Sequence, residues 1–208
     1  MGNLNLTPVV RDLLIINILV YVGTMMLPSE EQQAAITQQL AVFYPESPFF
    51  KPWQIITHMF MHGSINHIFF NMFGLVSIGP SVEAMFGPKK FLFYYLFCGV
   101  GAVLLQFAVQ YYEFHYGSNP AVALIPMVGA SGAIFGLLAA YGMLFPNNQL
   151  MLMFIPYPIR AKYFVLLYAA FELFSGIGGF QVGVAHFAHV GGALFGFLLI
   201  LYWRNGRL

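Results

Sequence analysis

Six apolar stretches, each near the length of a membrane-spanning helix, constrain this chain more than any other feature. A helix needs about 20 mostly apolar residues to cross the hydrocarbon core of a bilayer. Only 7% of the 208 residues are charged, whereas soluble domains carry about 25%. The sequence therefore predicts an all-α membrane protein, a six-transmembrane-helix bundle in which residues 1–208 form a single membrane domain. The six predicted spans are Val10–Leu27, Ile65–Met85, Phe91–Tyr112, Ala130–Phe145, Ile159–Ser175 and Val184–Trp203.

The connections between the stretches predict the orientation of the bundle. The first connection, Pro28–Gly63, is too interrupted by prolines to span but apolar enough to lie at the membrane surface. Lysine and arginine favour cytoplasmic loops. Seven of the eight basic residues, all except Lys51, flank the ends that share a side with both termini. Both termini are therefore predicted to be cytoplasmic. The net charge of +1 gives no indication of a nucleic-acid partner.

Polar side chains recur near the starts of the second, fourth and sixth stretches. With both termini inside, these three stretches all begin at the outer surface, and a rise of about 1.5 Å per residue places the side chains within a few turns of it. Ionisable groups inside a bilayer are costly and usually mark a functional site. The side chains predicted to converge at this depth are His62, His67, Asn71, Ser131, His186 and His189.

Glycine spacing predicts which of these side chains meet. A glycine pair spaced four residues apart begins at Gly132, and another begins at Gly192; such pairs let two membrane helices approach closely. Ser131 precedes the first pair, and His189 shares a helix face with the second. A serine hydroxyl becomes a nucleophile when a base within about 2.6–3.2 Å removes its proton. Imidazole can do this near neutral pH.

Donors for a developing oxyanion are also present. Ser131 begins a predicted helix, where backbone N–H groups are unpaired and the dipole favours negative charge. His67 and Asn71, four residues apart, present two further donors on one face. Two alternatives stay open: a protein that binds membrane substrates without cutting them, and a metal centre. The metal ligands would be His62, His67, His186 and His189, although no acidic residue is expected near them and Glu172 has no assigned partner.

Three motifs together resemble those of the rhomboid intramembrane serine proteases: His62-Gly63-Ser64-Ile65-Asn66-His67 with Asn71, Gly129-Ala130-Ser131-Gly132, and Ala188-His189 with the two glycines after it. The resemblance implies an endopeptidase that cleaves peptide bonds in or next to the transmembrane segments of other membrane proteins. It implies a catalytic Ser131–His189 dyad without an acid and no metal or cofactor. The further residues that it implies are His67, Asn71 and Gly129 for oxyanion and substrate binding, with His62, His186 and Phe135 around them.

The implied partners are transmembrane protein substrates and the lipid bilayer, with no nucleic acid, and the expected location is the cell membrane. Two residues depart from the family's pattern. Gln54 follows Trp53 where many members carry arginine, so anchoring of the first loop is expected to differ. Phe135 stands where a tyrosine often stacks on the catalytic histidine. Glu83 matches a glutamate that is expected to be structural.

Overall fold

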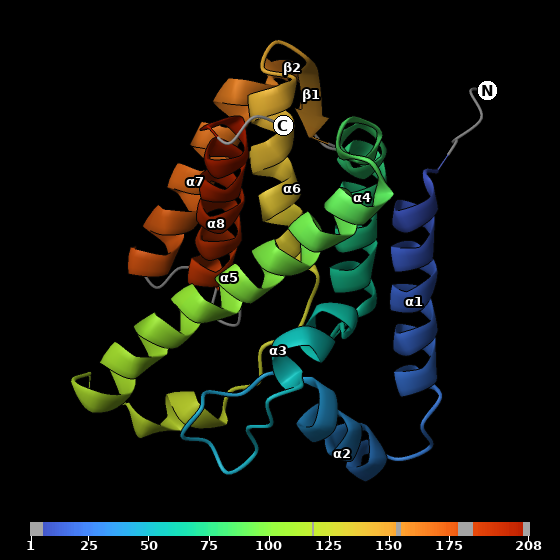
Figure 1. Ribbon diagram of the computed structural model, residues 1–208. Coiled ribbons are helices and arrows are strands. Elements are labelled where there is room, and N and C mark those ends of the chain that lie inside the picture. Colours follow the sequence, from blue (N-terminus) through green and yellow to red (C-terminus); the bar gives the residue numbers. More distant parts are fainter. Residues whose placement is uncertain (1–5, 118, 153–154, 179–184, 206–208) are drawn as a thin grey trace.

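The computed structural model describes residues 6–117, 119–152, 155–178 and 185–205 (Figure 1). Within these ranges the regular secondary structure is helical apart from one two-stranded antiparallel hairpin and one isolated β-bridge. The elements are α1 (Pro8–Met25), α2 (Glu30–Leu40), α3 (Gln54–Thr57), η1 (His58–Phe60), α4 (Ile65–Phe86), α5 (Pro88–His115), η2 (Pro120–Leu124), α6 (Ser131–Leu144), β1 (Gln149–Leu152), β2 (Ile155–Arg160), α7 (Ala161–Gly178) and α8 (His186–Asn205).

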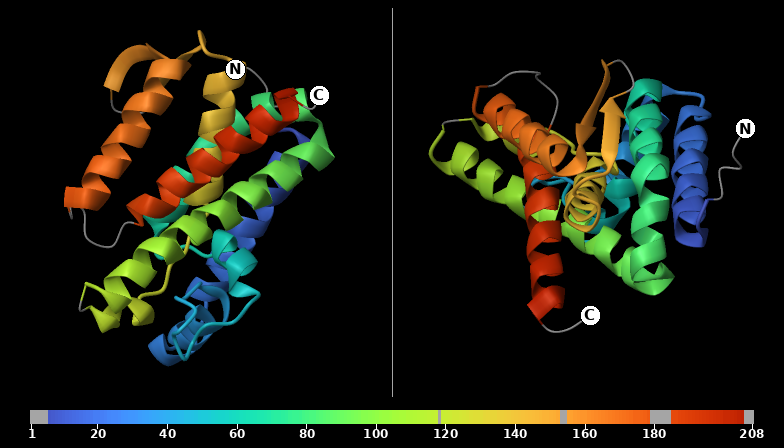
Figure 2. Two further views of the ribbon diagram at one scale, coloured as in Figure 1. Left: turned by 60° about the vertical axis from the view of Figure 1, so that its left-hand side comes forward. Right: turned by 90° about the horizontal axis from the view of Figure 1, so that it is seen from above.

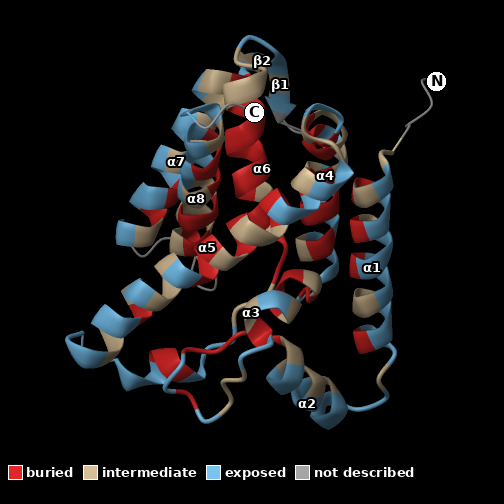
Figure 3. Cartoon of the chain, viewed as in Figure 1, coloured by how far each residue is buried: buried red, intermediate tan, exposed pale blue. Residues whose placement is uncertain are grey.

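Among the described residues, five helices are long and apolar enough to cross a membrane: α1, α4, α5, α7 and α8. Their outer faces carry exposed apolar side chains such as Leu19, Phe69 and Leu166, as a surface in contact with lipid requires. The sixth apolar helix, α6, has only 14 residues. It is mostly buried and packs against α4, α5, α7 and α8 (Figure 3). The predicted multi-pass membrane protein is confirmed, with five helices of spanning length around a shorter buried one.

The predicted spans end within three residues of the observed helices wherever the structure describes both, although Val184 lies outside the described residues. The hairpin β1–β2, between α6 and α7, was not predicted. Ile159 lies in β2 opposite Leu150 rather than in a helix. Arg160 is paired in the same way with Gln149 of β1. The fifth apolar helix therefore begins only at Ala161.

The helices alternate in direction, so α4, α6 and α8 all begin toward one end of the bundle, which we call the site end (Figures 1 and 2). The N-terminal ends of α1, α5 and α7 lie toward the opposite end, together with the C-terminal end of α8. The first connection adds α2, α3 and η1 at the site end. Three helix starts, which lie far apart in the sequence, are thereby brought together.

Gln54 anchors this first connection in the position where an arginine was noted as common. Its side chain is fully buried. The side-chain amide donates hydrogen bonds to the carbonyl oxygens of Gln38 (2.8 Å) and Phe49 (2.9 Å), and its oxygen accepts one from the backbone N–H of Lys51 (3.0 Å). A neutral amide thus satisfies three backbone groups of the loop, because it both donates and accepts.

Glycines set the distance between α6 and α8. A Cβ added at Gly192 would overlap the backbone carbonyl of Gly132, and one at Gly136 would overlap the Cys98 side chain and come within 3.1 Å of the Gly192 carbonyl oxygen. Tyr94 closes the same region by donating a hydrogen bond to the carbonyl oxygen of Gly136 (2.8 Å). The two backbones are therefore in direct contact, as the glycine spacing predicted.

Glu83 is buried in α4 and holds the start of α1. Its carboxylate accepts hydrogen bonds from the backbone N–H groups of Val9 (3.0 Å) and Val10 (2.9 Å) and from the hydroxyl of Thr7 (2.5 Å). The first N–H groups of a helix have no partner within the helix, and they favour a negative charge. The contacts of Glu83 are thus structural, and they fasten α1 to α4.

Candidate active site

Ser131 and His189 meet at the site end of the bundle. Ser131 is the first residue of α6, and His189 lies in the first turn of α8. The Nε2 atom of His189 is 2.8 Å from the hydroxyl oxygen of Ser131, which is a hydrogen-bond distance. The close contact of Gly132 with Gly192, just beyond these two residues, keeps the helices near enough for this bond.

Phe135 holds the face of the His189 ring. The two rings are stacked, with centroids 4.4 Å apart and planes within 6° of each other. Phe135 also contacts Tyr168 of α7, with ring centroids 4.9 Å apart. The phenylalanine therefore fixes the plane of the imidazole by packing alone, without a hydroxyl.

Glu172 of α7 lies beside the two histidines of α8, so the expectation that no acidic residue is near this cluster is wrong. One carboxylate oxygen of Glu172 is 2.9 Å from Nδ1 of His189 and 2.6 Å from Nδ1 of His186. The side chains of Glu172 and His186 are each 5% exposed and that of His189 is 13% exposed. Burial of a carboxylate is unfavourable unless it is hydrogen-bonded, and the two imidazoles provide those bonds.

The predicted oxyanion residues also come together. Gly129 has φ of +119°, a conformation that favours glycine, and a Cβ there would lie 2.6 Å from Nε2 of His67 and 3.7 Å from Nδ2 of Asn71. The Asn71 amide donates to the backbone carbonyl of His67 (3.1 Å). No side chain caps the start of α6 at Ser131, and the first N–H groups of a helix have no partner within it.

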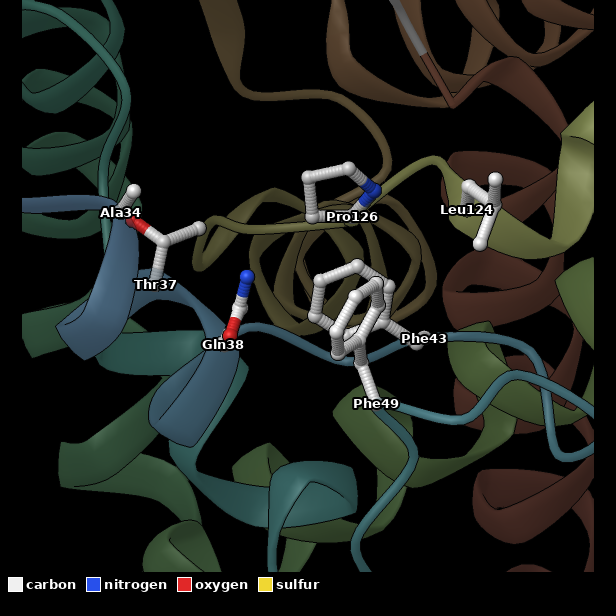
Figure 4. A pocket seen from close by; sticks show the side chains of 7 residues that line it. All are labelled: Ala34, Thr37, Gln38, Phe43, Phe49, Leu124 and Pro126. Carbon is white, nitrogen blue, oxygen red and sulfur yellow. The ribbon is translucent and has the colours of Figure 1, made fainter. Parts of the chain in front are cut away.

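These side chains line one large cavity of about 1050 Å³. Ser131, His189, His67, Asn71 and Gly129 all contribute to its wall. The rest of the wall is largely apolar and includes Phe73 of α4, Phe164 and Tyr168 of α7, and Leu150 and Met151 of the hairpin. A second pocket of about 240 Å³ lies between residues of the first connection, among them Thr37 of α2 and Phe49, and the segment with Leu124 and Pro126 (Figure 4). It contains none of the predicted site residues.

Residues 50–205 match the model of the Rhomboid domain. This chain belongs to the rhomboid family. It is similar to rhomboid protease AarA of Providencia stuartii, with 33% identity over 153 residues that cover 71% of this chain and 54% of that protein. Rhomboid protease GluP of Bacillus subtilis (strain 168) is 36% identical over 88 residues, which cover 42% of this chain and 15% of that protein.

A mitochondrial member of the rhomboid family is similar as well. The human presenilin-associated rhomboid-like protein, mitochondrial, is 31% identical over 152 residues, which cover 70% of this chain and 38% of that protein. The chain thus spans about half the length, or less, of these curated relatives. Because they include a mitochondrial protein, family membership does not specify which membrane holds this chain.

Two further histidines of this rhomboid chain, His58 and His62, are buried at the site end. His62 packs edge-on against His67, with ring centroids 5.0 Å apart, and neither of its ring nitrogens has a hydrogen-bond partner among the described residues. Burial, helped by the neighbouring His67, lowers the pKa of His62 to about 4. Burial also lowers the pKa of His58 to about 4, although its Nδ1 lies 3.0 Å from the carbonyl oxygen of Gln54. Both side chains are neutral at pH 7.

The alternative of a four-histidine metal centre does not match this arrangement. Within the described part of the chain, the side chains that could share one ion are Glu172, His186 and His189. His62 and His67 pack against each other by the α4 wall of the cavity and are not part of that set. The residue that sequence reasoning missed is therefore Glu172. Its position within an apolar stretch was the available signal, because a charge inside a membrane helix implies a partner.

Proposed function

We propose that this chain is an intramembrane serine endopeptidase that cleaves peptide bonds in or next to transmembrane segments of membrane proteins. The observation that carries the proposal is the 2.8 Å contact between the Ser131 hydroxyl and His189 at the wall of a 1050 Å³ cavity. Membership of the rhomboid family, and relatives that are named proteases, support a protease function. The cavity is large enough for several residues of an extended peptide.

In the proposed reaction, Ser131 Oγ attacks the carbonyl carbon of the scissile bond while His189 Nε2 takes its proton. The negative oxygen of the tetrahedral intermediate is bound by the Ser131 backbone N–H, with His67 and Asn71 as further donors. The intermediate then collapses, and His189 passes its proton to the departing amine. Water, activated by the same imidazole, hydrolyses the acyl-enzyme and restores the serine.

We further infer that α6 completes a six-span bundle whose termini face the cytoplasm. Lysine and arginine occur at the ends of α1, α5, α7 and α8 that lie opposite the site end. With 14 residues, α6 is about 21 Å long, less than the roughly 30 Å of a hydrocarbon core. A helix of this length that reaches the cytoplasmic face would leave Ser131 below the outer surface, open to water from the site end. We also propose that residues 1–208 form one membrane domain and that it lies in the cell membrane.

The test is cleavage of a model transmembrane substrate by the purified protein in liposomes, beside Ser131→Ala and His189→Ala. We expect cleavage by the wild type, loss of cleavage in both variants and no effect of a chelator. Activity that survives Ser131→Ala, or that a chelator abolishes, would contradict the proposal. A wild type that binds but does not cut a panel of such substrates would point instead to the alternative of a binding protein.

A further inference from the structure

We propose that Glu172 is a positioning residue that holds His189 in the tautomer and orientation needed to accept the proton of Ser131. This inference rests on the proposed function, because it gives Glu172 its role within the same site. It departs from a two-residue mechanism in one respect: the imidazole that acts as base is itself bound by a buried carboxylate. Glu172, His189 and Ser131 then form one hydrogen-bonded chain from α7 through α8 to α6.

The chemistry of the carboxylate determines the direction of these hydrogen bonds. An ionised carboxylate only accepts hydrogen bonds, and a neutral imidazole has one N–H donor and one acceptor nitrogen. Nδ1 of His189, 2.9 Å from Glu172, must therefore carry the proton. Nε2, 2.8 Å from Ser131, is left as the acceptor. In the opposite tautomer Nε2 would carry hydrogen and would be unable to take the serine proton.

His186 fixes the carboxylate itself. Its Nδ1 is 2.6 Å from the oxygen of Glu172 that also contacts His189. One carboxylate oxygen can accept two such bonds, and N–H bonds to a charged acceptor are stronger than those between neutral groups. Two donors on α8, three residues apart, thus hold the carboxylate that α7 provides, and the His189 ring has a fixed partner.

The short distances favour this hydrogen-bonded chain over a shared metal ion. Two ligands of a tetrahedral zinc ion, with bonds of about 2.0–2.1 Å, lie roughly 3.3 Å apart. The two histidine nitrogens lie 2.6 and 2.9 Å from the Glu172 oxygen, which are hydrogen-bond lengths. Phe135 holds only the plane of the His189 ring, and stacking does not select a tautomer. That selection, and stabilisation of the imidazolium that forms during attack, fall to Glu172.

The experiment compares full-length wild type with Glu172→Gln, and with Ser175→Ala as a matched control on a buried residue of the same helix. The first readout is the rate at which a fluorophosphonate labels Ser131 in detergent, which needs no protein substrate. The second is the tautomer of His189, read from ¹⁵N chemical shifts of histidine-labelled protein. The third is the Tm, which reports a purely structural effect.

We expect Glu172→Gln to lower the labelling rate about 10- to 100-fold, part of the 10²- to 10⁴-fold that a general base contributes, while Ser175→Ala labels like the wild type. In wild type, the proton of neutral His189 should be on Nδ1. Labelling of Glu172→Gln within twofold of wild type would overturn the proposal, as would a wild-type His189 protonated on Nε2. A fall in Tm with an unchanged labelling rate would also overturn it.

These readouts separate this proposal from the protease assignment. Rapid labelling of wild-type Ser131 without cleavage of any membrane substrate would count against the proposed function, while Glu172→Gln still tests the role of the carboxylate. If Glu172→Gln does not fold, or if wild-type Ser131 does not label, the role of Glu172 is tested by one measurement, the tautomer of His189 in the wild type. Protonation on Nδ1 supports the assignment and protonation on Nε2 refutes it.

Discussion

Replacement of Gly192 by alanine should reduce cleavage about 100-fold, because the added methyl group forces apart the helices that carry Ser131 and His189. In the structure a Cβ at this position would overlap the carbonyl oxygen, carbon and Cα of Gly132. These are backbone atoms, so no side-chain rotation can relieve the overlap. Either α6 or α8 must move.

The size of the effect follows from the geometry. Relief of the overlap needs a helix displacement of about 1 Å, and a misplacement of that size can lower a rate about 10²-fold. The Ser131–His189 contact of 2.8 Å would stretch beyond the range of about 3 Å for a hydrogen bond between these groups. Overpacking of this kind also destabilises a protein by about 1–3 kcal/mol, even though alanine is the better helix former by roughly 1 kcal/mol.

The assay measures kcat/KM for a model substrate in detergent, together with the Tm. Gly23→Ala in α1 is the matched control, because a Cβ there would have nothing within 4 Å; it should behave like the wild type. A Gly192→Ala protein with wild-type kcat/KM and wild-type Tm would contradict the predicted displacement of α6 from α8. A lower Tm with unchanged kcat/KM would show that the glycine contact stabilises the bundle without setting the distance between Ser131 and His189.

Three further substitutions test other parts of the structure. Phe135→Leu should lower kcat about 2- to 10-fold, since an aromatic pair contributes about 0.5–1.5 kcal/mol. Phe135→Tyr should have a kcat near that of the wild type. If the wild type and both variants had the same kcat, the stacking of Phe135 on His189 would have no role in the reaction. Glu83→Gln should lower the Tm, because hydrogen bonds to a charged acceptor contribute about 1.5–3 kcal/mol. The rate at which fluorophosphonate labels the folded protein should not change. A slower labelling rate would contradict a purely structural role for Glu83. The pKa of His58 and of His62 is about 4 in the folded protein, against an ordinary value of 6.5. The unfolded chain therefore binds more protons between these pH values, and stability should fall as pH drops from about 6.5 to 4. The Tm measured against pH should show this slope, and His62→Gln should reduce it; a flat wild-type Tm across that range would contradict the argument.

Much of the fold could be predicted because the signals that determine it are local. The length of an apolar stretch reports a membrane helix without knowledge of its neighbours, and the observed ends of α4 and α6 lie within one residue of the prediction. Glycine spacing also carries tertiary information, since only a residue without a side chain lets backbones touch. The positions of Gly132 and Gly192 therefore predicted which helix faces pack.

The contacts of Glu172 could not be predicted from the sequence. Its place in an apolar stretch implied a partner, yet the choice of partner depends on how α7 is rotated about its axis. Tyr168 lies one turn before Glu172, and both face the site in the structure. That rotation is set by the packing of α7 against α6 and α8, which no local pattern in the sequence encodes. The hairpin before α7 was missed because an apolar strand and the start of an apolar helix have the same composition.

The two buried carboxylates of this bundle show why similar burial leads to different roles. Glu83 accepts hydrogen bonds from backbone N–H groups of α1, and an amide does not change its protonation state near neutral pH, so those contacts can only hold a helix in place. Glu172 accepts from two imidazoles, and an imidazole can take up and pass on a proton during a reaction. Because one of the two imidazoles contacts Ser131, the same interaction that satisfies a buried charge also acts on the base of the proposed reaction.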